Sequence, residues 1–422
     1  MDFFRELQGR GLIYQHTDEK ALCKRLEAGP ITLYCGFDPT ADSLHIGHLL
    51  PLLILRRFQL AGHKPIALVG GGTGLIGDPS GKVSERTLNP KEVVQQWAQK
   101  IKNQLERFLD FETGVNPAIL ANNYEWLGSL QVIEFLRDIG KNFPLGAMLA
   151  KDAVETRMSK GISFTEFSYM ILQSYDFLKL NEMYGCEMQV GGSDQWGNIT
   201  SGIELIRRTS VDQAKEMHGL TMPLVTKSDG TKFGKTEAGA VWLDPEKMSP
   251  YKFYQFWMNT DDRDVVKFLK YFTFISLDEI AVLAGGVEKE PEKRRAQRIL
   301  ATEVTKLVHG QDALERAEKI SSALFGGGLK DLSATEIEDG FSDVPSATIE
   351  NLEITLVDML IQAGAVSSKR QAREAIENGS IYINDIRHTN VETAVSQLER
   401  LAEKYLVVRR GKKNYYLIKL EN

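Results

Sequence analysis

The chain has 422 residues, of which 42% are hydrophobic and 26% charged, and its formal net charge is −6. Its length exceeds what one core ordinarily holds, so we expect a globular protein of two or three domains. No apolar run approaches the roughly 20 residues of a membrane span, and the start lacks the basic-then-apolar pattern of a secretion signal. Three cysteines without metal-ligand spacing argue against a zinc site and favour a reducing, cytoplasmic environment.

Short apolar segments in the first half of the chain predict four strands, at 31–34, 65–69, 118–121 and 187–190. Strands that alternate with helical patterns of about 12 residues or more predict a parallel, doubly wound sheet, which is an α/β fold. Ligands of such a sheet bind at the carboxyl ends of its strands. The motifs of this region fall at such ends or on a neighbouring helix, which indicates one shared site.

The first strand leads into Pro-Thr-Ala-Asp-Ser-Leu-His-Ile-Gly-His at 39–48, followed by a helix predicted over 49–60. A helix N-terminus with free N–H groups attracts anions, and His45 and His48 can donate to phosphate oxygens. Gly47 lets a flat base approach the backbone. A His-x-x-His pair at a helix start is more often a cap and a satisfied core histidine, so the motif alone leaves both interpretations open.

The second strand is followed by a glycine-rich run in which Gly72-x-Gly74-x-x-Gly77 satisfies the dinucleotide-binding fingerprint. A dehydrogenase would then need another strand that ends in an acidic residue about 20 residues later. That position falls inside an amphipathic helix predicted over 91–111, with Val94 and Trp97 on its apolar face. The oxidoreductase alternative therefore lacks its expected context.

The segment 163–180 is predicted to be a helix with a polar face. On a helix of about 100° per residue, Gln173 lies about 40° from Tyr169 on one side, and Asp176 about 20° from it on the other. Phe167 and Leu178 fall on the opposite face. Periodicity alone favours a surface helix with its polar side in water.

Two further segments carry polar groups in glycine-containing turns. Residues 191–198, Gly-Gly-Ser-Asp-Gln-Trp-Gly-Asn, follow the fourth strand, and an Asp there can accept from both hydroxyls of a ribose. Lys-Phe-Gly-Lys-Thr at 232–236 places Lys232 and Lys235 three residues apart, where they can act as mobile charges over phosphates. Each segment alone is weak evidence, because such turns and lysine loops are usually only solvated.

From about residue 249 to 322 the pattern is helical only, and the Gly-, Ser- and acid-rich stretch 326–349 is typical of a linker. Helices are then predicted over 356–364 and 368–378, with a strand at 381–383. The negative net charge does not exclude RNA binding, because local patches decide it. Basic residues are bunched here: Lys369, Arg370, Arg373, Arg409, Arg410, Lys412 and Lys413.

In this order, the motifs at 39–48 and 232–236 resemble the two signatures of class I aminoacyl-tRNA synthetases. The resemblance is most specific to the tyrosyl-tRNA synthetase family and runs essentially from end to end. The second motif departs from the commoner Lys-Met-Ser-Lys-Ser form but keeps both lysines. Residues 368–384, Ser-Lys-Arg-Gln-Ala-Arg-Glu-Ala-Ile-Glu-Asn-Gly-Ser-Ile-Tyr-Ile-Asn, are similar to the small RNA-binding module named for ribosomal protein S-four.

The resemblance implies an architecture and a set of partners. It implies a homodimer in the cytoplasm that binds L-tyrosine, ATP and tRNA(Tyr), with Mg²⁺ accompanying ATP and no protein-bound metal. The segment 143–147 departs from the Val-Asn pattern that the family has before Met148-Leu149. The implied domains are a Rossmann-like catalytic domain over 1–247 with a dimer-forming insertion near 112–160, an all-α anticodon-binding domain over 248–325, a linker over 326–349, and an α+β S-four-like RNA-binding domain over 350–422.

The resemblance also implies residue roles. Asp176 would accept the proton of the substrate phenol and Tyr34 would donate to its oxygen. The substrate ammonium would be held by Tyr169, Gln173 and Asp78. The adenylate would be bound by Gly36, Asp38, Gly47, Gly192, Asp194 and Gln195. The phosphates and the leaving pyrophosphate would be stabilised by Thr40, His45, His48, Lys82, Arg86, Lys232 and Lys235.

Two alternatives accompany this prediction. A tryptophanyl-tRNA synthetase is the nearest enzymatic rival, but it should lack both the phenol-binding pair and the C-terminal RNA module. A non-catalytic RNA-binding relative that kept the fold is the other, and the intact signatures argue against it.

Overall fold

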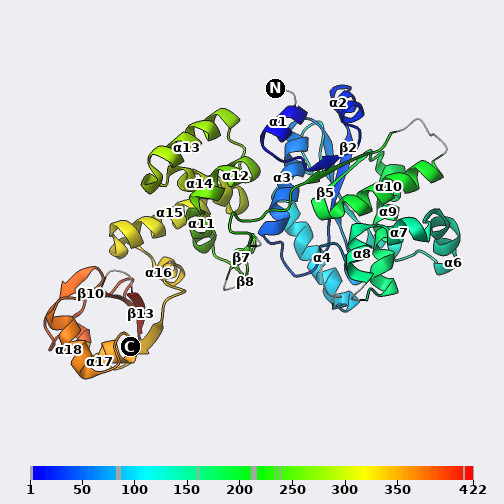
Figure 1. The fold of residues 1–422 in the computed structure, drawn as a ribbon. Helices are drawn as coiled ribbons and strands as arrows, with labels where there is room; N and C mark the ends of the chain where they lie inside the picture. Colours follow the sequence, from blue (N-terminus) through cyan, green and yellow to red (C-terminus); the bar gives the residue numbers. More distant parts are fainter. Residues whose placement is uncertain are drawn as a thin grey trace. The chain divides into compact units, whose positions relative to one another are not determined.

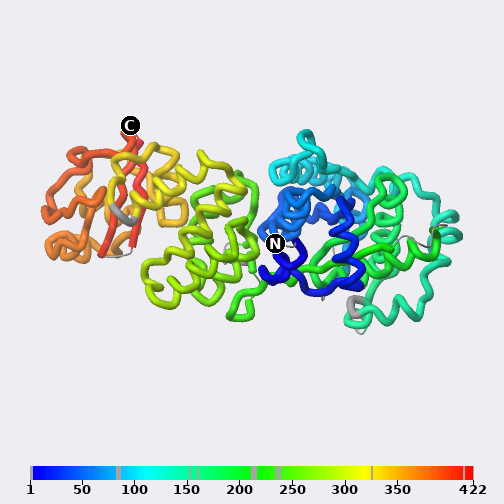
Figure 2. The backbone as a smooth tube through the Cα atoms, turned by 90° about the horizontal axis from the view of Figure 1, so that it is seen from above, coloured from blue at the N-terminus to red at the C-terminus, as the bar shows by residue number. Residues whose placement is uncertain are grey.

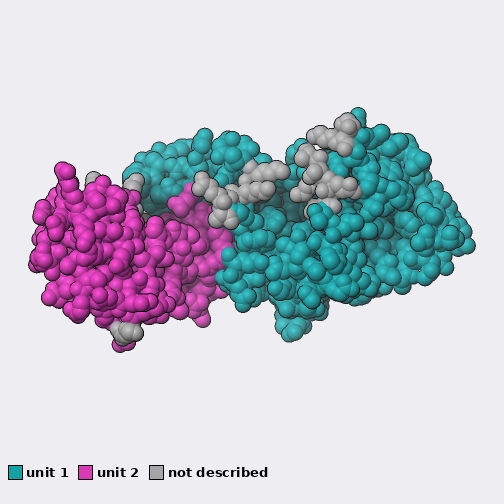
Figure 3. Space-filling model, turned by 90° about the horizontal axis from the view of Figure 1, so that it is seen from below, with its two compact units in different colours: residues 1–247, 260–300 teal, residues 248–259, 301–422 magenta. Residues whose placement is uncertain are grey.

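The computed structural model describes residues 3–81, 87–158, 161–210, 216–231, 233–236, 239–411 and 414–421. The chain divides into two compact units, shown in teal and magenta in Figure 3. The first unit comprises residues 1–247 and 260–300, and the second comprises residues 248–259 and 301–422. Within the described ranges, no helix has the length and apolar character needed to cross a membrane.

The first unit is built on a six-stranded sheet with strand order β1-β6-β5-β2-β3-β4. All neighbouring strands are parallel except β1, an edge strand of two residues that runs antiparallel to β6. The predicted parallel α/β sheet is confirmed, with β1 and β6 as strands that the sequence analysis did not identify. The strands are β1 (Gln15–His16), β2 (Thr32–Phe37), β3 (Lys64–Val69), β4 (Ile119–Asn122), β5 (Met188–Gly192) and β6 (His218–Met222).

Helices cover both faces of this sheet, with α3 and α4 on one side and α9 and α10 on the other (Figure 1). The helix α3 begins three residues before the prediction because His45 and His48 form a reciprocal N-terminal cap. The helix α9 ends where Gly185 takes a left-handed conformation with φ 63°. The longer helices of the part of the chain that contains this sheet are α1 (Phe3–Gly9), α2 (Glu19–Glu27), α3 (Ile46–Leu60), α4 (Lys91–Leu105), α9 (Phe164–Tyr184) and α10 (Trp196–Thr209).

The segment between β4 and α9, which the prediction treats as an insertion, is made of short helices. These are α5 (Tyr124–Leu127), α6 (Val132–Glu134), the π-helix η2 (Phe135–Ile139), α7 (Leu145–Leu149) and α8 (Asp152–Met158). Buried Trp126, Ile139 and Met148 join Tyr34 and Phe177 in one apolar cluster. This cluster therefore supports the strand β2 and the helix α9 from behind.

Between residues 249 and 322 the structure has only helices, as predicted, but the two units share them differently from the predicted boundary at 247/248. The helices α12 (Asp262–Phe272) and α13 (Leu277–Lys289) group with the first unit. The buried Arg10 explains this grouping, because its guanidinium donates to the carbonyls of Thr273 (3.4 Å) and Ile275 (2.8 Å) between these two helices. The other helices are α11 (Pro250–Met258), α14 (Arg295–His309) and α15 (Gln311–Gly326).

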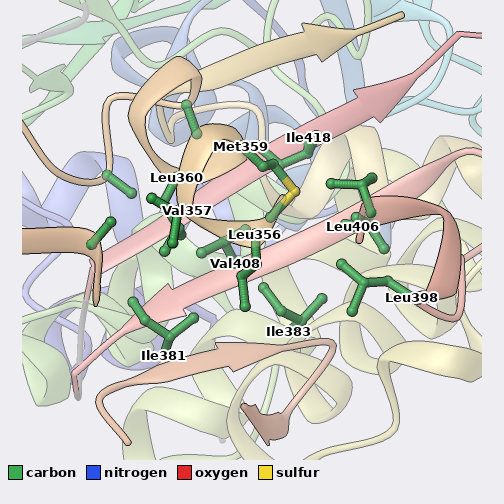
Figure 4. Packing of buried hydrophobic residues seen from close by; sticks show 14 of the residues in the cluster. Leu356, Val357, Met359, Leu360, Ile381, Ile383, Leu398, Leu406, Val408 and Ile418 are labelled. Carbon is green, nitrogen blue, oxygen red and sulfur yellow. The ribbon is translucent and has the colours of Figure 1, made fainter. Parts of the chain in front are cut away.

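The C-terminal part of the second unit is an α+β fold, as predicted. A five-stranded sheet of order β11-β10-β12-β13-β9 packs on two helices, whose apolar side chains meet those of the strands in Figure 4. The red strands lie beside the orange helices in Figure 2. The elements are α17 (Leu356–Gln362), α18 (Lys369–Glu377), β10 (Ile381–Ile383), β11 (Ile386–His388), β12 (Tyr405–Arg410) and β13 (Asn414–Leu420).

The stretch 326–349, predicted as a linker, instead contains the helix α16 (Ala334–Gly340) and the strand β9 (Ser346–Ile349). Ser333 and Glu336 form a capping box at the start of α16, and Lys319 donates to Glu336 at 2.8 Å. The strand β9 pairs in parallel with β13. The serines and acids that suggest a linker by composition therefore serve as helix caps and as an edge strand.

Candidate active site

A cavity of about 310 Å³ lies at the carboxyl ends of β2 and β5, beside the start of α3. This is the edge at which a parallel sheet binds ligands. The cavity is lined by every predicted site residue whose side chain or glycine backbone the structure describes: Tyr34, Gly36, Asp38, Thr40, His45, Gly47, His48, Asp78, Tyr169, Gln173, Asp176, Gly192, Asp194 and Gln195.

Asp176 lines the cavity and is only 2% exposed. Its Oδ1 accepts from the indole Nε1 of Trp126 at 2.7 Å, and its Oδ2 accepts from Nδ2 of Asn123 at 2.9 Å. The helix α9 therefore turns Asp176 inward, although periodicity alone favoured a solvated face. Two donors behind the carboxyl group fix its orientation toward the cavity.

Tyr34, in β2, brings a phenol to the same cavity. Its hydroxyl is buried and has no hydrogen-bond partner among the described residues. Leaving a buried donor unpaired costs about 1–3 kcal/mol, so a group that completes this hydrogen bond is favoured. The neighbouring strand places Gln189 opposite Tyr34, and its buried Oε1 is also without a partner among the described residues.

The ionisation of Asp176 and Tyr34 is set by burial. Burial raises the pKa of Asp176 to about 8, although the hydrogen bonds from Asn123 and Trp126 lower it. Burial and then the charge of Asp176 raise the pKa of Tyr34 well above its ordinary value. Burial therefore favours the neutral form of Asp176 within the cavity.

A second polar cluster lines the middle of the cavity around two carboxylates. The hydroxyls of Tyr169 and Thr73 each donate to Asp38 at 2.7 Å. Asp78 accepts from Nε2 of Gln195 at 2.8 Å, and Nε2 of Gln173 donates to Oε1 of Gln195 at 3.2 Å. The groups predicted to hold the substrate ammonium thus form a network with two acids, which suits a positive charge.

Each histidine of the 39–48 motif uses its Nδ1 as a hydrogen-bond acceptor. Nδ1 of His45 accepts from the backbone N–H of Gly47 at 3.0 Å, and Nδ1 of His48 accepts from the N–H of His45 at 3.1 Å. Desolvation and then the nearby His45 lower the pKa of His48 to about 3. With Nδ1 used as an acceptor, each neutral ring carries its proton on Nε2. The histidines can therefore cap the helix through Nδ1 and still donate from Nε2 to a phosphate oxygen.

The glycine-rich run after β3 serves close packing. A Cβ at Gly70 would lie 1.9 Å from Oδ1 of Asp38, and one at Gly71 would lie 2.3 Å from Oδ1 of Asn122. These glycines let the side chains of Asp38, which lines the cavity, and of Asn122 approach the backbone. This close packing explains the glycine-rich run, so the run does not require a bound dinucleotide.

The segment 233–236 lies against the start of α3. The carbonyl of Gly234 accepts from Val241 N at 3.0 Å, and the carbonyl of Val241 accepts from Ile46 N at 2.8 Å. A Cβ on Gly234, which has φ 81°, would lie 2.3 Å from Cγ2 of Ile46. The structure therefore brings the backbones of the two motifs together. Lys82, Arg86 and Lys232 lie outside the described residues, and the side chain of Lys235 is not described either.

Sequence reasoning missed four polar or aromatic residues of the site: Thr73, Asn123, Trp126 and Gln189. Asn123 links the two polar clusters of the cavity, because it donates to Asp176 and to Thr73 (2.8 Å) while its Oδ1 accepts from Gly72 N (2.7 Å). In the sequence, Asn123 could have been recognised as a candidate because it lies directly after a predicted strand. Trp126 gave no such signal, since its contact with Asp176 spans 50 residues.

Comparisons with known proteins agree with this geometry. Residues 26–326 match the family model "tRNA synthetases class I (W and Y)", and residues 336–418 match "Tyrosine--tRNA ligase SYY-like C-terminal domain". The chain is 72% identical over 420 residues to the tyrosine--tRNA ligase of Desulfitobacterium hafniense (strain DSM 10664 / DCB-2), covering 100% of both chains. It is 62% identical to tyrosine--tRNA ligase 1 of Bacillus subtilis (strain 168), with 99% of each chain covered.

A solved structure shares the fold. The C-terminally truncated mitochondrial tyrosyl-tRNA synthetase of Aspergillus nidulans superposes with a TM-score of 0.69 at 31% identity, covering 77% of this chain and 94% of that one. The matched family models and the full-length relatives therefore place the chain, together with the cavity described above, in the tyrosine--tRNA ligase family of class I tRNA synthetases.

Proposed function

We propose that the chain activates L-tyrosine with ATP, giving tyrosyl-adenylate and pyrophosphate, and then transfers the tyrosyl group to the terminal ribose of tRNA(Tyr). The observation that carries this proposal is the unpaired, buried hydroxyl of Tyr34 beside the buried carboxyl group of Asp176. These two groups match the one donor and two acceptor positions of a phenol. The family of the chain makes tyrosine the natural ligand for them.

The tyrosine substrate would lie with its phenol between Tyr34 and Asp176 and its ammonium near Asp38 and Asp78. Tyr169 and Gln173 would orient the ammonium through the network that they share with these acids. A phenylalanine in the same position would leave the buried polar groups unpaired, so the pocket would reject it. This arrangement accounts for selectivity by binding alone.

In the first step, the tyrosine carboxylate would attack the α-phosphorus of ATP and pyrophosphate would leave. Little covalent chemistry falls to the protein in such a step, so positioning and charge stabilisation must lower the barrier. His45 and His48 would donate from Nε2 to phosphate oxygens. Lys232 and Lys235 would neutralise the leaving pyrophosphate, with Mg²⁺ bound to the phosphates of ATP itself.

The adenosine would lie over the glycines of the cavity. Gly47 is exposed at the start of α3, and Gly192 ends β5 next to Asp194. Asp194 would accept from the ribose hydroxyls, and Thr40, exposed at the cavity rim, would contact the phosphates. The family resemblance assigns Lys82 and Arg86 to the phosphates as well.

We assign tRNA binding to the C-terminal α+β fold. Arg370 and Arg373 are exposed on α18, and the guanidinium of Arg409 lies 3.9 Å from the ring centroid of Tyr382. Such basic groups bind RNA mainly through its phosphates, so tRNA affinity should fall steeply with salt. Replacing Arg370 and Arg373 with Glu should impair tRNA charging and leave tyrosine activation unchanged.

We also propose a cytoplasmic homodimer that forms through the insertion between β4 and α9. Five apolar side chains of this insertion are between 41% and 72% exposed in the single chain: Val132, Ile133, Leu136, Leu145 and Leu149. An exposed apolar group of this extent indicates a protein interface. Analytical ultracentrifugation of wild type and Ile133→Asp should show a dimer and a monomer, respectively.

Tyrosine-dependent ATP–pyrophosphate exchange tests the main proposal. The assay should give strong exchange with tyrosine and very little with phenylalanine or tryptophan at equal concentrations. Exchange driven by tryptophan would contradict the assignment of the phenol pocket. A complete lack of exchange with all three amino acids would favour a non-catalytic role.

A further inference from the structure

The helix α12 carries a buried acid that the catalytic proposal does not use. Asp264 is 2% exposed, and its oxygens accept from the backbone N–H of Ser228 at 3.0 and 3.1 Å and from its hydroxyl at 3.1 Å. Lys267, one turn further, bridges Asp264 (2.9 Å) and the carbonyl of Thr226 (2.7 Å). Both residues therefore hold the chain just before the lysine motif. A buried carboxylate with this set of partners fixes the segment that it binds.

Between this contact and Lys232 the chain forms a closed turn. Lys227 N donates to the carbonyl of Thr231 at 3.1 Å, and Gly230 N donates to the carbonyl of Lys227 at 3.0 Å. Oδ1 of Asp229 accepts from Thr231 N at 2.8 Å. The turn therefore transmits the position of Ser228 to the residue that precedes Lys232.

The residue between the two lysines is anchored on the same helix. The ring of Phe233 lies 4.7 Å from that of Phe268 and 5.4 Å from that of Phe272, measured between centroids. Both partner rings are buried, at 3% and 0% exposure. Asp264, Phe268 and Phe272 are spaced four residues apart, so they line one face of α12.

The far end of α12 is fixed to the helix that carries the histidine motif. Arg57, buried on α3, donates to the carbonyl of Thr273, which directly follows α12. Arg10 donates to the same carbonyl at 3.4 Å. The end of α12 and the last turn of α3 therefore belong to one connected set of contacts.

We propose that the face of α12 formed by Asp264, Phe268 and Phe272 is a platform that positions the two lysines for adenylate formation. Asp264 and Phe233 are then positioning residues, since neither lines the cavity. This inference rests on the proposed role of Lys232 and Lys235 in stabilising pyrophosphate. A displacement of about 1 Å at such a group can cost about 100-fold in rate, which makes the platform important for the first step.

The test compares the two steps of the reaction in Asp264→Ala and Phe233→Ala. Adenylate formation should slow by about 10- to 100-fold in single-turnover experiments, because the lysines lose their position. The dissociation constant for tyrosine and the transfer from preformed adenylate to tRNA should stay within about twofold of wild type, because neither involves the departing phosphates. Phe233→Met, which restores an apolar side chain of similar length, should recover most of the loss.

Lys270→Ala is the matched control on the same helix. Within the described ranges, the side chain of Lys270 makes no hydrogen bond or ion pair with residues 226–236, so all three measurements should match wild type. Equal losses in tyrosine binding, adenylate formation and transfer would overturn the proposal and leave Asp264 with a structural role. Wild-type adenylate formation in both variants would overturn it as well.

Two further variants keep the outcome decisive. Ser228→Ala removes a single hydroxyl from an exposed residue, so it should fold normally and still slow only adenylate formation if Asp264→Ala does not fold. Lys235→Ala separates this inference from the proposal on which it rests. If Lys235→Ala does not slow adenylate formation, the proposed role of the lysines in stabilising pyrophosphate is wrong. If Lys235→Ala slows that step and the variants of Asp264, Phe233 and Ser228 do not, the lysine role stands and the platform proposal is wrong.

Discussion

The indole N–H of Trp126 donates to Oδ1 of Asp176 over 2.7 Å, so a residue of the short helix α5 orients an acid that lines the cavity. Asn123 donates to the other oxygen of the same carboxyl group. Both donors come from the segment directly after β4, whereas Asp176 comes from α9. The orientation of this carboxyl group therefore depends on two elements that are far apart in the sequence.

Replacing Trp126 with Phe keeps the aromatic volume and removes the donor to Asp176. A hydrogen bond of this kind contributes about 1–3 kcal/mol, so kcat/KM for tyrosine in pyrophosphate exchange should fall by about 10-fold. Since phenylalanine does not use Asp176, its much lower kcat/KM should be unchanged. Equal losses for the two amino acids would indicate damage to the packing instead.

The substitution Tyr34→Phe should have opposite effects on stability and selectivity. Because the hydroxyl of Tyr34 is buried without a partner, its removal should stabilise the unliganded protein by about 1 kcal/mol in urea denaturation. The same change should reduce the preference for tyrosine over phenylalanine in exchange. A lower stability of the variant would show that this hydroxyl is satisfied in solution.

The raised pKa of Asp176, about 8, predicts a pH dependence of stability. In the unfolded chain this group titrates near about pH 4, so between pH 4 and pH 8 the folded state holds the extra proton. The contribution of that proton is fully present below pH 4 and is lost as the pH rises toward 8. Asp176→Asn should therefore show a flatter change of unfolding free energy over this range than wild type.

The substitution Gly234→Ala should slow adenylate formation by at least about 10-fold. Its Cβ would meet Ile46 at 2.3 Å, and its φ of 81° disfavours any side chain. Gly230→Ala is the control, since Gly230 has a similar φ of 79° but nothing within 4 Å of the added Cβ. If both variants slow the step equally, backbone strain and not the contact with α3 is responsible.

The lowered pKa of His48, about 3, makes a prediction about activity. The ring is neutral above about pH 4, so it should contribute no titration to kcat/KM for ATP between pH 5 and pH 9. His48→Asn should lower the rate at every pH and leave the shape of the profile unchanged. A change of shape near pH 6.5 would show that His48 titrates normally in the enzyme.

Much of the fold was accessible from the sequence because local signals agreed with tertiary structure. The predicted strand at 65–69 corresponds to β3 (Lys64–Val69), since an apolar run ends at a glycine turn. The strand β6 was missed because His218-Gly-Leu-Thr-Met mixes polar and apolar residues, although all five are buried in the sheet. Burial from both faces cannot be seen in a five-residue pattern.

The site was accessible only in part for a related reason. Short motifs identified His45 and Lys235, and a family resemblance identified Asp176, which periodicity had placed on a solvated face. Trp126 and Asp264 have no motif, because their contacts with Asp176 and Ser228 arise from folding. Residues that orient other residues are therefore the part of an active site that a single sequence reveals least.

The two buried guanidinium groups of Arg10 and Arg57 make the N-terminal helix α1 indispensable to the molecule. Desolvation, and then repulsion from Arg10, lower the pKa of Arg57 to about 9, and the carboxylate of Glu6 on α1 counteracts this at 3.9 Å. A truncated protein that starts after residue 10 would lose Glu6, the acid beside Arg57, together with Arg10 and its hydrogen bonds to the carbonyls of Thr273 and Ile275. Shortened versions made for crystallography or biosensing should therefore retain α1, even though it contributes nothing to the substrate cavity.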